Sequence, residues 1–108
     1  MNIKKIDDRF STAGQITPDD IGMLKDNGFR AIVCARPDNE EPGQPTFAQI
    51  ESAARAAGLE AFQVPVSGQL TEGQIIRFHE AMANVDGPVL GYCRSGARAG
   101  SLYVTLDR

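Results

Sequence analysis

TEGQIIRFHEAMANVDGPVLGYCRSGARAG, residues 71–100, contains a predicted helix, a glycine, a short apolar run and a loop rich in small residues, in that order. Thr71 and Gln74 match a capping box, in which the threonine oxygen accepts from the third backbone N–H and the glutamine reaches back. The apolar run that follows Gly87, at residues 88–92, is typical of a buried strand. The segment therefore predicts a helix followed by a strand that leads directly into a polar loop.

The same order of helix, glycine and apolar run occurs twice earlier in the chain. Each predicted helix opens on threonine and closes on glycine, at residues 17–28 and 46–58, and the apolar runs follow at 29–34 and 59–64. Helices that alternate with strands predict an α/β fold with a mainly parallel sheet and helices on its faces. We expect residues 1–108 to form a single domain. Two earlier extended pieces, at residues 2–6 and 10–13, predict a strand or hairpin at one edge, and a last helix is predicted at residues 97–108.

Composition argues against several classes of function. The chain has 108 residues, a formal charge of −3 and no cluster of Lys or Arg, which argues against a nucleic-acid surface. No stretch approaches the roughly 20 apolar residues that span a bilayer, so we expect no membrane partner and a cytoplasmic location. One histidine and two cysteines offer no set of metal ligands at short spacing, and we expect neither a metal nor another cofactor.

The loop after the last apolar run carries the candidate catalytic residues. A cysteine there acts as a nucleophile when its thiolate is stabilised, and a turn from strand into helix directs unpaired backbone N–H groups at its sulfur. We predict Cys93 as the nucleophile and Arg98 as a planar fork of donors to a bound oxyanion. The anion-binding loop between them consists of Arg94, Ser95, Gly96 and Ala97. Alternatively, Cys93 is a buried structural thiol at a strand end.

The loops that follow parallel strands meet at one edge of the sheet, so the polar segment at residues 35–45 is expected beside Cys93. Arg36 is either a plain surface arginine or a residue that faces the site and binds an anionic donor. Cys34 is either a buried small residue or a thiol that resolves an oxidised or persulfidated Cys93. Asp38 is a possible accessory carboxylate.

The chain resembles the beta-lactamase hydrolase-like, phosphatase-like family, also known as DUF442 and described as a sulfur-transferase family. The matching stretches are GQITPDDI, ARPDNEEPGQP, AAGLEAFQVPV and GPVLGYCRSGARA, in that order, from residue 3 to about residue 106. The resemblance implies the fold of a dual-specificity phosphatase. It implies two activities, phosphatase and rhodanese-type sulfurtransferase, and a possible partner, because some members are fused to persulfide-oxidising metallohydrolases.

Loop length and the missing general acid favour sulfur over phosphate. Tyrosine phosphatases have five residues between cysteine and arginine, whereas Cys93 and Arg98 are separated by four, as in rhodaneses. Phosphatases of this fold usually carry an aspartate after the strand that here ends in FQVPV, and that loop reads SGQL; Asp38, Glu40 or Glu41 would have to reach in.

We therefore expect a sulfurtransferase that moves sulfur from a small anionic donor, such as thiosulfate or a persulfide, to a thiol acceptor. A phosphatase acting on a phosphate ester and a non-catalytic anion-binding module are the alternatives.

Overall fold

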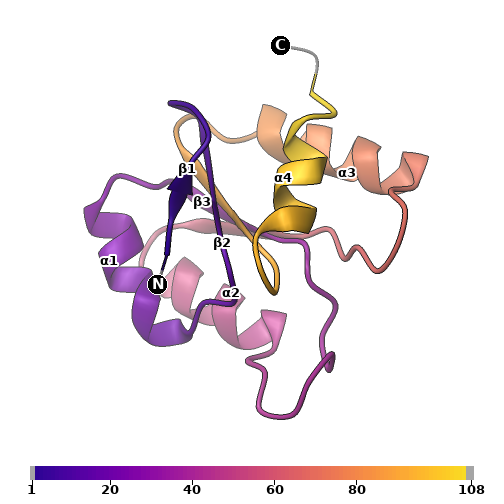
Figure 1. Ribbon diagram of the computed structural model, residues 1–108. Helices are drawn as coiled ribbons and strands as arrows, with labels where there is room; N and C mark the ends of the chain where they lie inside the picture. The colour runs from indigo at the N-terminus through magenta and orange to yellow at the C-terminus, as the bar shows by residue number, and fades with distance from the viewer. Residues whose placement is uncertain (1, 107–108) are drawn as a thin grey trace.

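The central sheet has five strands in the order β1-β2-β5-β3-β4, and the computed structural model describes residues 2–106 of the chain (Figure 1). The edge pair of β1 and β2 is antiparallel, and every other neighbouring pair is parallel. The strands are β1 (Lys4–Lys5), β2 (Phe10–Ala13), β3 (Ala31–Cys34), β4 (Glu60–Gln63) and β5 (Val89–Tyr92). The predicted mainly parallel sheet is confirmed, and of the two expectations for its edge, a strand or a hairpin, the structure shows the hairpin.

Helices cover both faces of the sheet. They are the 3-10 helix η1 (Pro18–Asp20), which leads into α1 (Ile21–Asp26), and the α-helices α2 (Phe47–Ala56), α3 (Glu72–Ala83) and α4 (Ala97–Tyr103). Thr46 and Thr71 each accept from the N–H three residues later, at 3.2 Å, and the glutamine there returns a bond to the threonine N–H. Both predicted capping boxes are therefore confirmed.

The last helix is shorter than predicted. It ends at Tyr103 rather than residue 108, and residues 107 and 108 lie outside the described part of the chain. The Thr105 hydroxyl donates to the Leu102 carbonyl at 2.6 Å, and the Thr105 N–H donates to the same oxygen at 3.1 Å. Such local bonds compete with the next helical turn, which accounts for the early end.

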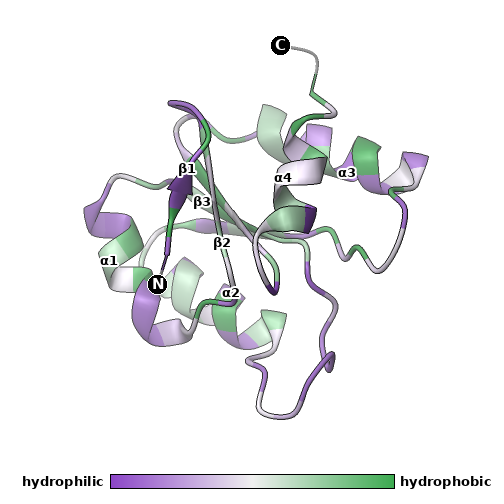
Figure 2. Cartoon of the chain, viewed as in Figure 1, coloured by the Kyte–Doolittle hydropathy of each residue, from purple (hydrophilic) through white to green (hydrophobic). Residues whose placement is uncertain are grey.

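Two hydrophobic clusters lie on opposite faces of the sheet. Figure 2 shows that the helices over the sheet carry both hydrophobic (green) and hydrophilic (purple) residues. The cluster against α3 and α4 contains Phe10, whose ring stacks on Tyr103 with centroids 4.3 Å apart. The cluster against α1 and α2 contains Ile50. Because side chains alternate along a strand, β5 places Val89 in the first cluster and Leu90 in the second. Both faces of the sheet are thus covered by packed side chains, so a functional site is expected at the loops that follow the strands.

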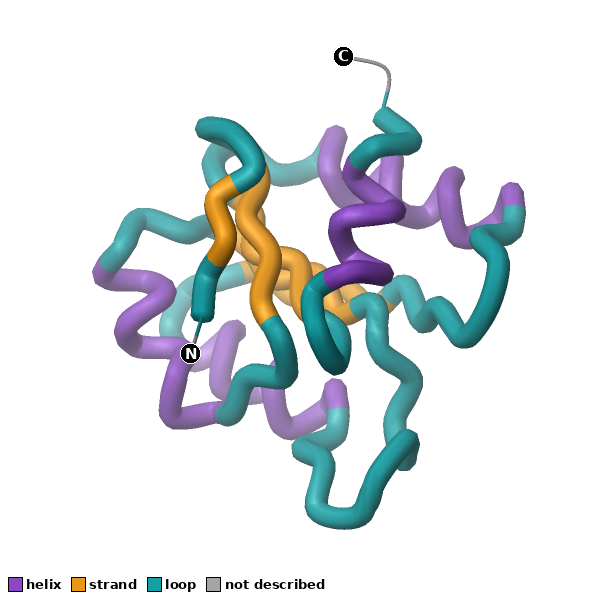
Figure 3. Tube along the Cα trace, in the orientation of Figure 1, coloured by secondary structure: helices purple, strands orange, loops and turns teal. Residues whose placement is uncertain are grey.

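The loops that follow β3, β4 and β5 leave the sheet on the same side, at the carboxyl ends of these strands (Figure 3). They comprise residues 35–46, 64–71 and 93–96. Parallel pairing causes this gathering, because parallel strands all end on one side. Within residues 2–106, no helix combines the length and the apolar character that crossing a lipid bilayer requires.

Candidate active site

The loop at residues 93–96 connects β5 to α4 by the tight turn that the sequence predicts. Gly96 stands immediately before α4 with φ of +94°, in the left-handed region that side chains rarely adopt. A Cβ there would lie 3.3 Å from the Ala13 carbonyl oxygen of β2. The glycine therefore serves both the turn and the close contact between the loop and the sheet.

Cys93 lies at the base of this loop, where its sulfur is surrounded by backbone donors. The residue is 0 % exposed, and the Gly96 N–H donates to its Sγ at 3.0 Å. Burial opposes ionisation of the thiol, but backbone N–H groups in residues 95–99 outweigh it and lower the pKa of Cys93 from its usual value. The loop stabilises a thiolate, which is the form that acts as a nucleophile.

Arg98 joins all three loops at this edge. Its Nη1 donates to the Val66 carbonyl oxygen at 2.7 Å and to Glu40 Oε2 at 2.8 Å, and its Nη2 donates to Glu40 Oε1 at 2.8 Å. The bond with Glu40 raises the pKa of Arg98 most, and a smaller attraction to Cys93 also raises it. The two nitrogens of Arg98 that are predicted to bind an oxyanion thus bind a carboxylate of the same chain in this structure.

Arg36 holds that carboxylate from the interior. Its guanidinium is 0 % exposed and donates to Glu40 and Glu41, both at 2.9 Å, and to Gln15 Oε1 at 3.0 Å. Arg98 first and Arg36 second lower the pKa of Glu40 to about 2. Arg36 also lowers the pKa of Glu41. Arg36 is buried, so the prediction of a plain surface arginine is wrong. The nitrogens of Arg36 are engaged by Glu40, Glu41 and Gln15, which leaves the residue to position Glu40 rather than to contact a donor.

The other predicted loop residues lie around the rim. Arg94 is exposed, with its Nη2 4.0 Å from Glu41 Oε2. The Ser95 hydroxyl accepts from the Ala97 N–H at 3.4 Å, so the exposed Ser95 side chain caps the turn. Asp38 accepts from the Phe47 N–H at 2.8 Å and thus engages the start of α2. The structure therefore assigns Asp38 a contact with α2.

Cys34 lies at the end of β3, next to Tyr92 in the register of the sheet. It is 2 % exposed, and its thiol donates to the Arg36 carbonyl oxygen at 3.2 Å. Burial raises the pKa of Cys34 in spite of hydrogen bonds with Tyr92 and the Arg36 backbone, which lower it. Both cysteines are buried, but their pKa values shift in opposite directions. The raised pKa and the contacts of Cys34 favour a structural role for it.

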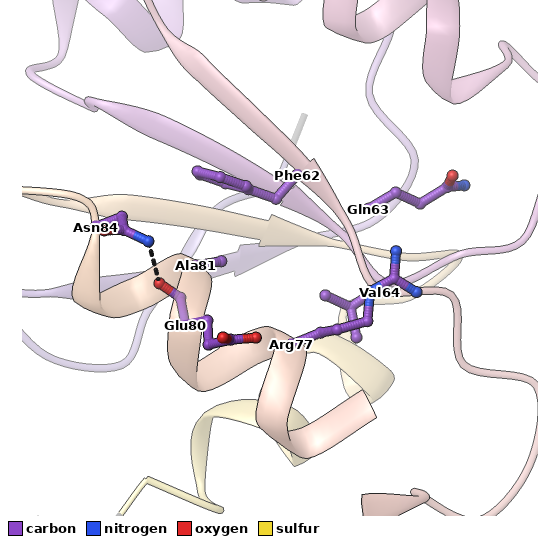
Figure 4. A pocket seen from close by; sticks show the side chains of 7 residues that line it. All are labelled: Phe62, Gln63, Val64, Arg77, Glu80, Ala81 and Asn84. Carbon is purple, nitrogen blue, oxygen red and sulfur yellow. Dashed lines mark hydrogen bonds between the residues drawn. The ribbon is translucent and has the colours of Figure 1, made fainter. Parts of the chain in front are cut away.

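A groove of about 380 Å³ lies elsewhere, between β4 and α3 (Figure 4). Its lining residues are Phe62, Gln63, Val64, Arg77, Glu80, Ala81 and Asn84. Figure 4 shows the Asn84 amide donating to the Glu80 carbonyl oxygen, a bond that closes the end of α3. The groove includes no residue of the Cys93 loop, so we place the active site at the loop instead. Residues 2–106 contain no group of three or more His, Cys, Asp or Glu side chains placed to hold a metal.

Sequence reasoning did not single out Gln15, and it named Glu40 only as a carboxylate that would have to reach in as a general acid. The two residues complete the contacts of Arg36 and Arg98, and neither belongs to a periodic pattern. Arg36 and Glu40 are four residues apart, a spacing that indicates an ion pair when both residues lie on a helix. Here both lie in a loop, so the spacing alone could not predict their contact.

Known proteins resemble this chain over nearly its whole length. Residues 2–106 match the model of the family described as the phosphatase-like domain of beta-lactamase hydrolase-like proteins. A beta-lactamase hydrolase-like protein from Agrobacterium fabrum is 46 % identical over 105 residues, which are 96 % of this chain and 24 % of that protein. The chain thus spans about a quarter of the length of the curated relatives it matches.

Solved structures show the same fold. A protein from Neisseria meningitidis, proposed to be a phosphatase, is 34 % identical with a TM-score of 0.84, over 95 % of this chain and 74 % of that one. The core catalytic domain of a PP-IP phosphatase from S. cerevisiae is 18 % identical with a TM-score of 0.69, over 94 % and 62 % of the two chains. These similarities confirm the predicted phosphatase-like fold.

Proposed function

We propose that this chain, which belongs to the family of phosphatase-like domains of beta-lactamase hydrolase-like proteins, is a cysteine-dependent sulfurtransferase with Cys93 as the sulfur carrier. The observation that carries the proposal is a stabilised thiolate beside carboxylates that arginines hold ionised. The Gly96 N–H donates to the sulfur at 3.0 Å, and the positive charge of Arg98 attracts the thiolate. These groups suit a nucleophile whose leaving group needs no proton.

In the first step, the Cys93 thiolate attacks the outer sulfur of a donor such as thiosulfate. A new S–S bond forms on Cys93, and the donor S–S bond breaks with its electron pair on sulfite. In the second step, an acceptor thiolate attacks the outer sulfur of the Cys93 persulfide. The Cys93 thiolate then leaves and the site is restored, so no oxidant or reductant is consumed.

The carboxylates near the loop are poorly suited to phosphomonoester cleavage, whose leaving group needs a carboxylic acid worth about 10²–10⁴ in rate. A general acid must hold a proton at neutral pH, and the pKa of Glu40 lies at about 2, while Arg36 lowers the pKa of Glu41. Asp38 accepts from the Phe47 N–H. Sulfite and thiolates leave as stable anions, so sulfur transfer does not require the missing acid.

A cysteine-dependent phosphatase is the second candidate, and the comparisons favour it more directly than the first. The family is described as phosphatase-like, and the relative from Neisseria meningitidis is proposed to be a phosphatase. In that reaction Cys93 attacks phosphorus, the ester oxygen leaves, and water releases phosphate from the phosphocysteine. Arg98 and the loop N–H groups would bind the phosphoryl oxygens.

One set of assays separates the candidates. Wild type, Cys93→Ser and the matched control Cys34→Ser are each given thiosulfate with cyanide, and separately an aryl phosphate. We expect thiocyanate from wild type and Cys34→Ser, none from Cys93→Ser, and no phosphate release. Cysteine-dependent phosphate release without thiocyanate overturns the proposal in favour of the phosphatase, and neither product leaves an anion-binding module.

A further inference from the structure

Glu40 occupies the position at Arg98 that an anionic ligand would take. Both carboxylate oxygens accept from Arg98 at 2.8 Å, the paired geometry in which a guanidinium binds an oxyanion. Oε1 also accepts from Arg36 at 2.9 Å, so the carboxylate bridges an arginine of the interior and an arginine of the site. The side chain is 28 % exposed, and it is therefore partly screened by solvent.

The charges around Arg98 are nearly balanced. Arg98 and Arg36 face Glu40, Glu41 pairs with Arg36, and Arg94 lies 4.0 Å from Glu41. Three cations thus meet two carboxylates and, once ionised, the Cys93 thiolate. A site of this kind lacks the excess positive charge that binding a dianion calls for.

We propose that Glu40 is a specificity-determining residue that selects against dianionic ligands at the Cys93 loop while it positions Arg98. A ligand with two negative charges meets the Glu40 carboxylate at the fork and is repelled by it. A ligand with one charge or none at its reacting end is repelled less, so thiosulfate, a dianion, is a weaker donor at this site than a persulfide with a single charge. The inference rests on the proposed function in one respect, that the Cys93 loop is where the ligand reacts.

Coulomb's law sets the size of the effect. A carboxylate within about 5 Å of the ligand changes affinity by about tenfold for each ligand charge at the effective dielectric of a protein surface, once salt screening is allowed for. Glu40→Gln removes that charge and keeps one oxygen that accepts from Arg98. Arg36 keeps its bonds to Glu41 and Gln15, so we expect the variant to fold.

The test compares two tetrahedral anions of different charge, sulfate and methanesulfonate, by calorimetric titration. For Glu40→Gln we expect sulfate to bind about a hundredfold and methanesulfonate about tenfold more tightly than to wild type, so that the preference for sulfate rises about tenfold. A purely structural role would weaken or leave unchanged the binding of both anions. An unchanged preference in a folded Glu40→Gln protein overturns the inference.

Two further variants separate charge from shape. Glu41→Gln makes the same change of net charge but touches Arg36 and Arg94 rather than Arg98, and we expect a change below about threefold. An equal gain in Glu41→Gln shows a general field effect and overturns a specific role for Glu40. Glu40→Asp keeps the charge and should retain most of the wild-type preference. Should Glu40→Gln fail to fold, Glu40→Ala makes the same charge change.

The inference about Glu40 and the proposed function can be refuted separately, because one is measured by binding and the other by turnover. If wild type produces neither thiocyanate nor phosphate, the proposed function is wrong, and the altered sulfate preference of Glu40→Gln still supports the inference. In active protein, Glu40→Gln should lower the KM for thiosulfate, a dianion, while kcat falls because Arg98 is held less firmly. An unchanged KM argues against the inference without touching the role of Cys93.

Discussion

Replacing the buried arginine of the site, Arg36→Met, tests whether the interior supports the Cys93 loop. The guanidinium is 0 % exposed and donates to Glu40, Glu41 and Gln15 at 2.9, 2.9 and 3.0 Å. Removing one partner of a fully buried ion pair costs about 3–5 kcal/mol, because the other charge is left uncompensated. The Glu40 and Glu41 side chains are 28 % and 45 % exposed, so water compensates part of the loss and we expect about 2–3 kcal/mol.

The assay is urea unfolding together with thermal melting, for which we expect a fall in Tm of about 10–20 °C in a chain of this size. The matched control is Arg55→Met, because Arg55 also donates to a glutamate, Glu51, at 3.2 Å but with side chains 57 % and 37 % exposed. Such an exposed pair contributes about 0–1 kcal/mol. Equal losses in the two variants would refute the reasoning, since burial would then make no difference.

Further predictions concern the charge and geometry of the same site. Because the pKa of Cys93 is lowered, its alkylation by iodoacetamide should reach half its maximal rate below the pH of about 8.5 typical of a free thiol. Cys34, whose pKa is raised by burial, should react more slowly than Cys93 at neutral pH, and equally fast labelling of both thiols contradicts this. Gly96→Ala should raise the alkylation midpoint of Cys93, since a left-handed φ of +94° costs an alanine about 1–2 kcal/mol and displaces the N–H donor. The folded pKa of Glu40 is lowered to about 2, so its stabilising effect should be complete above pH 4.5 and disappear as the pH falls toward 2. Urea unfolding of wild type and Glu40→Gln should therefore differ at pH 6 and converge near pH 2; a constant difference contradicts the lowered pKa.

Much of the architecture could be predicted because its signals are local. Thr46 and Thr71 are predicted N-caps and both accept the expected hydrogen bonds, and the apolar runs after the glycines form β3, β4 and β5. The predicted last helix was too long because the bonds of Thr105 with Leu102 end it early. These features depend on residues within a few positions of one another, which is the range over which a sequence pattern carries information.

By itself, the sequence determined the local arrangement of the Cys93 loop. Cys93, Gly96 and Arg98 lie within six consecutive residues between a strand and a helix, and that order alone places a sulfur beneath backbone donors. Only the tertiary structure decided the charge state of the site, because Arg98 meets Glu40 across 58 positions of the chain and Arg36 holds Glu40 from the interior. A pKa depends on distances and burial in space, so no spacing in the sequence could show that the nearest carboxylate is held ionised and is unsuited to act as an acid.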